Sequence, residues 1–378
     1  MSFQREVDIE VQSNTWPNLK SIPTELTLLQ KNSPKVLNVL LTLLYTAIWT
    51  RPPVQLGFSL SDCWAWLRYF PAIDNQNILK LTQEWSHIDP HQKTILSDDF
   101  GVGVSTWLLH ETLDFKYYVD TIYLLNTLNP GLFYLGKTSK RGPNKSPDFI
   151  AIDSKNRFSV IECKGTQSSR DALRKALSRG IPQKSNLHSS GKTKIQNSLV
   201  SGIFIPQWEN NERPLFAVCD PEWKEFINIF KDFSSDQILT GIFKVSLAKE
   251  FAILGLFNTY KFLINPESQF SSFDEEFKSD LSGESGISPN RFEDKIQFQH
   301  SQTFGEPFFD KDDKYQKVVF KTMIKMEIIE ELRISKTSDN LFAFVEDRIK
   351  SNEWISEAGN TGVKLTSPLG FHYSMSLD

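Results

Sequence analysis

Apolar residues recur along the chain in two different rhythms, and the rhythm changes from one segment to the next. Residues 36–49 carry apolar side chains at helical spacing up to Arg51-Pro52-Pro53, so a buried helix is expected there. A second stripe through residues 105–129, with Leu108, Phe115 and Tyr118 on one face, predicts a long helix. We therefore expect the first 100 residues to form a helical N-terminal region.

Apolar runs of strand length follow the second helix. Residues 149–153 and 158–163 flank the turn residues 154–156, which predicts a hairpin. The second run is apolar on both faces, as is typical of a central strand covered on both sides. Residues 199–206 and 214–219 predict two further strands. The pattern indicates an α/β protein whose mixed sheet is flanked by helices.

A basic helix is predicted directly after the hairpin. Ser169 is a suitable N-cap for a helix over residues 170–179, and Gly180 is a suitable terminator. Leu173 and Leu177 belong to its apolar stripe, so its charged side chains form an outer edge. The basic side chains of this edge are Arg170, Arg174 and Lys175.

The remainder of the chain is less regular. Residues 238–263 are apolar without a clear rhythm, and residues 271–290 are acidic and Ser-rich, which predicts a linker or disordered loop. Helices are predicted over residues 318–329 and 341–349. The expected organisation is a helical region over 1–100, a central α/β domain over 101–265, an acidic linker or loop over 266–290 and an α/β region over 291–378.

Composition places the chain among ordinary globular proteins, with 378 residues, a net charge of −4 and 39% apolar residues. Residues 137–194 depart from this average, because they hold fourteen Lys or Arg and four Asp or Glu. Such a basic segment in an acidic protein indicates a polyanion site, and a solvated basic surface is the other interpretation. The three cysteines predict neither a disulfide framework nor a zinc site. With no secretory signal or membrane-spanning run, a cytoplasmic protein is expected.

Acidic and basic side chains interrupt the apolar hairpin at defined points. Asp148 opens the first strand, whereas Glu162 and Lys164 share one face of the second. Two carboxylates at the ends of neighbouring strands can share a Mg²⁺ ion, and a nearby lysine can orient or deprotonate a water or hold developing negative charge. Glu111 interrupts the stripe of the preceding helix, either at its edge or for a functional reason.

The order of helix, Pro147-Asp148, Glu162-Cys163-Lys164 and basic helix resembles the PD-(D/E)xK nuclease superfamily. The resemblance covers residues 105–220 and implies a restriction-endonuclease-like core. It implies a metal-dependent nuclease that hydrolyses phosphodiester bonds, with DNA favoured over RNA and internal cleavage over exonuclease action. Restriction or antiviral defence against foreign DNA is the implied setting. The flanking regions are then expected to serve target recognition, oligomerisation or docking to a partner protein.

The resemblance also implies roles for individual residues. Asp148, Glu162 and the backbone carbonyl of Cys163 would hold Mg²⁺, for which Mn²⁺ can substitute. Lys164 would be the catalytic base or water positioner, and Glu111 would lie near the metal or its water. The residues expected to contact nucleic acid are Lys140, Arg141, Lys145, Arg170, Arg174, Lys175, Gln183 and Lys184.

Three other interpretations remain open at this point. The same fold can bind nucleic acid or a partner protein without turnover. The hairpin can be purely structural, with a surface salt bridge between Glu162 and Lys164. Finally, Cys163 and His188 can serve a different hydrolase as nucleophile and base, although their spacing specifies no such site.

Overall fold

The computed structural model divides the chain into two compact units. Unit 1 comprises Met1–Thr50 and Trp66–Ile238, and unit 2 comprises Arg51–Ala65 and Leu239–Asp378. The sequence-based boundaries at 100, 265 and 290 do not coincide with this division. The structure describes residues 3–50, 69–121, 123–124, 147–184, 195–220, 235–264, 272–284, 290–291, 295–303, 317–334 and 338–377.

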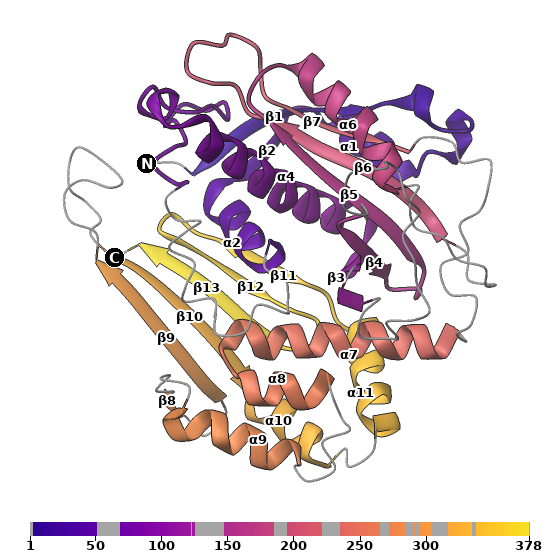
Figure 1. The fold of residues 1–378 in the computed structure, drawn as a ribbon, viewed down its shortest axis with the longest axis vertical. Helices are drawn as coiled ribbons and strands as arrows, with labels where there is room; N and C mark the ends of the chain where they lie inside the picture. The colour runs from indigo at the N-terminus through magenta and orange to yellow at the C-terminus, as the bar shows by residue number, and fades with distance from the viewer. Residues whose placement is uncertain are drawn as a thin grey trace, which may run out of the picture. The chain divides into compact units, whose positions relative to one another are not determined.

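A mixed seven-stranded sheet organises unit 1, in the order β2-β1-β7-β6-β5-β4-β3 (Figure 1). Strand β5 runs parallel to β6 and β1 runs parallel to β7, whereas the other neighbours are antiparallel. The mixed α/β architecture predicted from the sequence is confirmed. The strands are β1 (Gln4–Val11), β2 (Lys35–Asn38), β3 (Phe115–Asp120), β4 (Phe149–Asp153), β5 (Phe158–Thr166), β6 (Ile195–Phe204) and β7 (Leu215–Cys219).

Helices flank this sheet. The longest begins at Pro90, where the side chain of Asp89 caps it by accepting a hydrogen bond from the His91 amide. It ends at Leu113 and is followed by the cap residue Asp114, which adopts a left-handed conformation with φ of 56°. None of the helices that the structure describes is long and apolar enough to cross a membrane. The helices of unit 1 are α1 (Thr24–Lys31), α2 (Val39–Trp49), α4 (Pro90–Leu113) and α6 (Arg170–Lys184), with short 3-10 turns η1 (Ser13–Thr15), η2 (Leu19–Ser21) and η4 (Glu84–His87).

Two predictions for the N-terminal half were wrong. The helix predicted over residues 105–129 ends at Leu113, and Phe115–Asp120 forms strand β3 instead. Its aromatic and β-branched residues suit a strand buried on both faces, and such a run also satisfies helical spacing. The first 100 residues are not helical throughout, because they supply β1 and β2 to the sheet.

The predictions around the hairpin were more successful. Strands β4 and β5 form as expected, and Asn156 in their turn has a positive φ of 58°. Strands β6 and β7 are also confirmed. Ser169 caps α6, since its hydroxyl accepts a hydrogen bond from the Ala172 amide at 3.0 Å. Gly180 does not end this helix, which continues to Lys184.

Unit 2 contains a six-stranded sheet in the order β11-β12-β13-β10-β9-β8, in which the neighbouring strands pair antiparallel. Its strands are β8 (Asn290–Arg291), β9 (Lys295–Thr303), β10 (Lys317–Lys325), β11 (Ile355–Ala358), β12 (Gly362–Thr366) and β13 (Phe371–Leu377). Its helices are α7 (Ser235–Leu254), which begins at the boundary with unit 1, α8 (Phe257–Ile264), α9 (Phe273–Ser279), the π-helical turn η5 (Asp280–Glu284), α10 (Met326–Ile334) and α11 (Ser338–Ser351).

The structure corrects two predictions in unit 2. The segment over residues 271–290 contains helix α9, which the reciprocal bonds between Ser272 and Glu275 cap. Residues 317–325 form strand β10 before α10 begins, because Val318, Phe320 and Ile324 alternate onto one buried face. The helix predicted over residues 341–349 is confirmed as α11.

Candidate functional site

The β4–β5 hairpin brings the two predicted carboxylates together. Its register pairs Phe149 with Ile161, so Asp148 lies opposite Glu162 just beyond the last pair. The backbone amide of Cys163 donates a hydrogen bond to Asp148 Oδ2 at 2.7 Å. Asp148 is therefore held against the strand that carries Glu162 by a contact that local sequence does not specify.

Glu162 lies almost entirely inside the protein, with 1% of the residue exposed. Its Oε1 atom forms an ion pair with Nζ of Lys164, two residues further along the same face of β5. Its Oε2 atom is also buried and has no hydrogen-bond partner among the residues that the structure describes. Burying an unsatisfied carboxylate oxygen is costly, so this atom points to a cation or a proton as its complement.

The pKa values of the two carboxylates are raised, as expected for acidic groups that are buried close together. Burial, followed by repulsion from Asp148, raises the pKa of Glu162 to about 8. Burial also raises the pKa of Asp148 to about 6, with Asp120 and Asp98 adding to the rise, although the Cys163 amide and Lys164 oppose it. At neutral pH the pair holds a proton that a divalent cation could displace.

Lys164 completes the cluster with a positive charge that is 23% exposed. Burial alone would lower its pKa, but the charge and hydrogen bond of Glu162, together with Asp148, raise it above the ordinary lysine value. Lys164 therefore stays protonated at neutral pH in this arrangement. It can hold negative charge or orient a water more readily than it can accept a proton.

Glycines allow helix α4 to approach the backbone of β5 at this point. A Cβ atom on Gly165 would lie 1.7 Å from the carbonyl oxygen of Ser97, and one on Gly101 would lie 2.7 Å from the carbonyl carbon of Lys164. Gln167 reinforces the contact by donating to the Lys93 carbonyl at 2.7 Å and to Ser97 Oγ at 3.0 Å. Residues 97–101 of α4 therefore adjoin Lys164 and Gly165 of β5.

This packing changes which acid of the helix lies near the site. Glu111 is bound elsewhere: it accepts a hydrogen bond from the Trp107 indole at 2.7 Å and pairs with Lys35 at 3.1 Å. Asp98 lies about 20 Å from Glu111 along the helix, at about 1.5 Å per residue. Burial raises the pKa of Asp98 and the charge of Lys164 opposes the rise, which associates Asp98 with the site.

The sequence analysis missed two carboxylates, Asp98 and Asp120. Asp120 ends β3 and pairs with Phe149, next to Asp148. Because the sequence predicts a helix over residues 105–129, it does not indicate that Asp120 lies in a strand beside Asp148. A signal for Asp98 was present: Gly101 and Gly103 lie shortly after it inside a helix, where glycine is unfavourable unless a backbone approaches closely.

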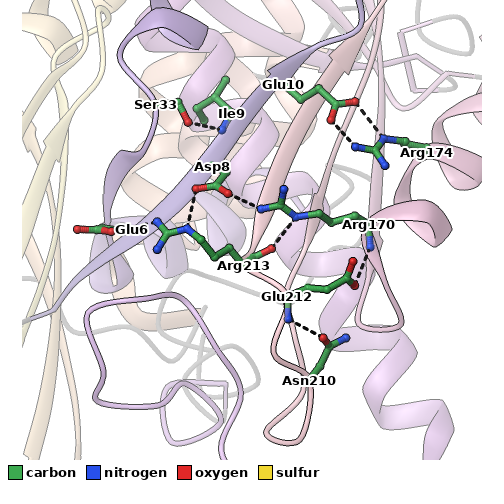
Figure 2. Close-up of polar contacts among 10 residues, drawn as sticks. All are labelled: Glu6, Asp8, Ile9, Glu10, Ser33, Arg170, Arg174, Asn210, Glu212 and Arg213. Atoms are coloured by element: carbon green, nitrogen blue, oxygen red, sulfur yellow. Dashed lines mark hydrogen bonds and ion pairs between the residues drawn. The ribbon is translucent and has the colours of Figure 1, made fainter.

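The basic edge of α6 faces an acidic strand. Glu6, Asp8 and Glu10 alternate along β1, so they share one face of the sheet. Figure 2 shows that Arg170 forms an ion pair with Asp8, and Arg174 pairs with Glu10 at 2.7 Å. These two arginines thus have structural partners that the sequence did not reveal.

Arg213 extends this network from the start of β7, reaching Asp8 at 3.0 Å and Glu6 at 3.1 Å (Figure 2). Of the other residues predicted to contact nucleic acid, Lys175 is exposed on α6. Gln183 and Lys184 lie in the last turn of α6, whose side chains the structure does not describe. Lys140, Arg141 and Lys145 fall outside the described residues.

A double-mutant cycle measures the structural part of this network. We expect Glu10→Ala and Arg174→Ala to show a coupling free energy of about 0.5–1 kcal/mol in urea unfolding, because both side chains remain partly exposed. High salt should reduce the coupling. The exposed pair of Glu346 and Lys350 provides a matched control with a smaller expected value. A coupling of zero would mean that the pair of Glu10 and Arg174 does not contribute to stability.

Cys163 does not have the properties of a nucleophile. Its side chain is buried, and burial followed by the charges of Asp148 and Glu162 raises the pKa of the thiol well above its ordinary value. A thiol held protonated is a poor nucleophile. Its proposed partner His188 lies outside the described residues. The ligand role expected for the Cys163 backbone carbonyl stays a prediction.

The fit of a metal ion to this site rests on Asp148 and Glu162. Within the described ranges, no group of three or more His, Cys, Asp or Glu side chains is close enough to enclose a metal. Two buried carboxylates with raised pKa values and one unsatisfied oxygen suit an oxygen-preferring cation such as Mg²⁺. In comparisons with known proteins, no family model, curated protein or solved structure matches the chain.

Proposed function

We propose that the protein is a metal-dependent nuclease that hydrolyses phosphodiester bonds, with DNA favoured over RNA as substrate. The observation that carries the proposal is the convergence of Asp148, Glu162 and Lys164, in which Glu162 Oε2 is buried with no hydrogen-bond partner in the described part of the chain. The resemblance to the PD-(D/E)xK superfamily suggests a restriction-endonuclease-like fold, internal cleavage and a role in restriction or defence. Cys163 and Cys219 are buried and form no disulfide among the described residues, which is compatible with the proposed cytoplasmic location.

Asp148 and Glu162 would hold Mg²⁺ or Mn²⁺ with their free oxygens, and the Cys163 carbonyl is a further candidate ligand. A bound divalent cation supplies charge neutralisation for the phosphate and an acidified water. The Cys163 amide keeps the Asp148 carboxylate in place through its hydrogen bond. Asp98, at the rim of the site, would take the role expected for Glu111 and can position a water.

Lys164 contributes a fixed positive charge beside the reacting phosphate. Since its pKa is raised, it remains protonated while the pentavalent phosphate accumulates negative charge. Its link to Glu162 keeps its ammonium group at the site. The role that follows is stabilisation of developing charge and orientation of water, in preference to that of general base.

The alternative is a catalytically silent module that binds nucleic acid or a partner protein. A module that only binds would have no use for two buried carboxylates with raised pKa values, because these reduce stability at neutral pH. Metal titration distinguishes the two, since the silent module has no reason to bind Mn²⁺ between Asp148 and Glu162.

Cleavage of defined substrates tests the proposal. We expect the purified protein to cut supercoiled DNA when Mg²⁺ is present and to lose this activity in Lys164→Ala. Parallel reactions with linear DNA and RNA identify the substrate and separate internal from terminal cleavage. Asp98→Asn should weaken the response to Mg²⁺, whereas Glu111→Gln should leave it unchanged.

Each of these cleavage experiments has an outcome that would contradict the proposed function. Metal-independent cleavage, or full activity in Lys164→Ala, would remove the assigned site. A normal metal response in Asp98→Asn together with a weakened one in Glu111→Gln would restore the role first expected for Glu111. Absence of cleavage on every substrate, with intact nucleic-acid binding, would favour the silent module.

A further inference from the structure

Charge is segregated within unit 2 between its sheet and its helices. The described strands β8–β13 contain six Lys or Arg and one acidic residue. Helices α9, α10 and α11 with the turn η5 contain eleven Asp or Glu and four Lys or Arg. Because the basic residues lie on the sheet and the acidic residues on these helices, the electrostatic potential near the sheet favours binding of an anion.

The two faces of this sheet have different surroundings. Phe371 and Tyr373 of β13 and Phe320 and Ile324 of β10 are buried. Their face packs against helices, since the rings of Phe371 and Phe251 lie 5.3 Å apart with edge-to-face geometry. The residues between them in sequence point to the opposite face.

That opposite face carries polar and basic side chains together with the apolar Val319, Met323 and Ile355, and we call it the lysine face. Strand pairing places Lys321 beside Ser374, and Ser374 beside Lys364 on β12. A second row joins Met323 to His372, and His372 to Thr366, whose hydroxyl lies 2.8 Å from His372 Nδ1. Lys325 and Lys295 complete the lysine face, which is thus defined by Lys295, Lys321, Lys325, Lys364, His372, Ser374 and Thr366.

Two of its lysines are direct neighbours. Lys295 of β9 and Lys325 of β10 are paired across the strands, where like charges are destabilising. Burial lowers the pKa of His372 first, and the charges of Lys325 and Lys295 lower it further, so both ammonium groups act on the same face. A repulsive pair of this kind is relieved by a bound anion.

Among the described residues, two carboxylates form ion pairs with lysines of this face. Glu357 lies 3.4 Å from Lys364, and Glu327 lies 3.9 Å from Lys325 while also contacting Arg348 at 3.6 Å. The side chains of Lys364 and Lys325 nevertheless remain 71% and 52% exposed. Solvent or a ligand can therefore reach both of these positive charges.

We propose that the lysine face of unit 2 binds the phosphate backbone of a nucleic acid. Lys321 and Lys325 are about 13 Å apart along β10, and the four strands from β9 to β12 span about 14 Å at the usual strand spacings. A duplex carries one charge per about 1.7 Å of its axis, so a length of about 13 Å carries about eight phosphate charges on its two strands, of which a part faces the patch. These dimensions favour a polyanion over a single phosphate. The serine and threonine hydroxyls and His372 add groups that suit phosphate oxygens.

The lysine face rests on the proposed nuclease function, for which it would hold the substrate. Binding of DNA in the absence of metal tests this surface separately from cleavage. The experiment measures fluorescence anisotropy of a labelled DNA duplex with the full chain in EDTA, over a series of salt concentrations. The test variant is Lys321→Gln/Lys325→Gln/Lys364→Gln. The control, Lys261→Gln/Lys278→Gln/Lys350→Gln, makes the same charge change at exposed positions on helices of the same unit.

We expect the test variant to bind duplex DNA at least about tenfold more weakly near 0.1 M salt, with a salt slope reduced by about 2 to 3. The control should match the wild type, and thermal unfolding should show that both variants fold. Wild-type affinity and slope in the test variant would overturn the proposal. So would a loss of binding to anionic lipid vesicles or an acidic peptide without a loss for DNA. Failure of metal-dependent cleavage with the expected binding result would contradict the nuclease function alone.

Discussion

Glu162→Gln is expected to abolish metal-dependent cleavage and, in the same protein, to stabilise the metal-free fold at alkaline pH. The amide cannot provide the negative charge that a divalent cation needs, and loss of metal assistance worth several kcal/mol lowers the rate by at least about 10²-fold. The substitution is nearly isosteric, so the buried position of the side chain should be retained. Cleavage assays over a Mg²⁺ series check the first part.

The stability gain follows from the raised pKa of Glu162. The folded protein holds this proton up to pH about 8, whereas the unfolded chain releases it near 4.5. Between these values the folded state binds more protons, so wild-type stability falls as pH rises through this window. Glutamine does not ionise, so the variant does not lose stability in this way as pH rises. In EDTA the melting temperatures of variant and wild type should be similar near pH 4 and differ by a few °C in favour of the variant above pH 8.

Mg²⁺ should stabilise the wild type and not the Glu162→Gln variant, so it should reverse the order of their melting temperatures at alkaline pH. Because Mg²⁺ displaces a proton from the carboxylate pair, it should raise the wild-type melting temperature more at pH 8 than at pH 6. Glu346→Gln, on the exposed surface of α11, serves as a control and should behave as the wild type. If the Glu162→Gln variant melts at a lower temperature than the wild type at pH 8 in EDTA, Glu162 has a structural role. If the variant still cleaves with Mg²⁺, Glu162 is not a metal ligand.

Gly165→Ala is expected to lower the free energy of unfolding by about 3 kcal/mol, at the upper end of the usual cost of overpacking. The added methyl group would lie 1.7 Å from the Ser97 carbonyl oxygen, a backbone atom that cannot rotate away. Helix α4 would have to move from β5, which also displaces Asp98 from Lys164. Urea unfolding measures the loss, and cleavage at a temperature where the variant is folded measures its effect on the site.

Gly359→Ala is the matched control for this substitution. The nearest heavy atom to a Cβ there lies 3.6 Å away, which is ordinary van der Waals contact. We expect its unfolding free energy to stay within about 0.5 kcal/mol of the wild type, as for most surface substitutions. If Gly165→Ala were equally stable, the close approach of α4 to β5 would be wrong, and with it the placement of Asp98.

Local patterns predicted the centre of the site well. The hairpin needs only two apolar runs and a turn such as Ser154-Lys155-Asn156, and residues close in sequence then pair in a defined register. That register alone places Asp148 opposite Glu162. The cap at Ser169 was also predicted, because its bond to Ala172 is local.

The errors at strands β3 and β10 share one physical cause, which is an ambiguous spacing of apolar residues. Phe115–Asp120 and Lys317–Lys325 contain apolar residues at spacings that satisfy either a strand or a helix, and only their neighbours decide between them. Strand β3 completes a sheet edge beside β4, and β10 lies between β9 and β13. These partners come from distant parts of the chain, so propensity could not identify them.

The sequence by itself determined the hairpin, its two carboxylates and the lysine that shares a face with Glu162, because these depend on alternation and on a short turn. Only the tertiary structure decided which helix acid adjoins them. Glu111 and Asp98 lie on one helix, and the close contact at Gly101 and Gly165 selects Asp98. Tertiary packing also gave Glu162 its raised pKa, since burial and a neighbouring charge come from the folded surroundings and not from residue type.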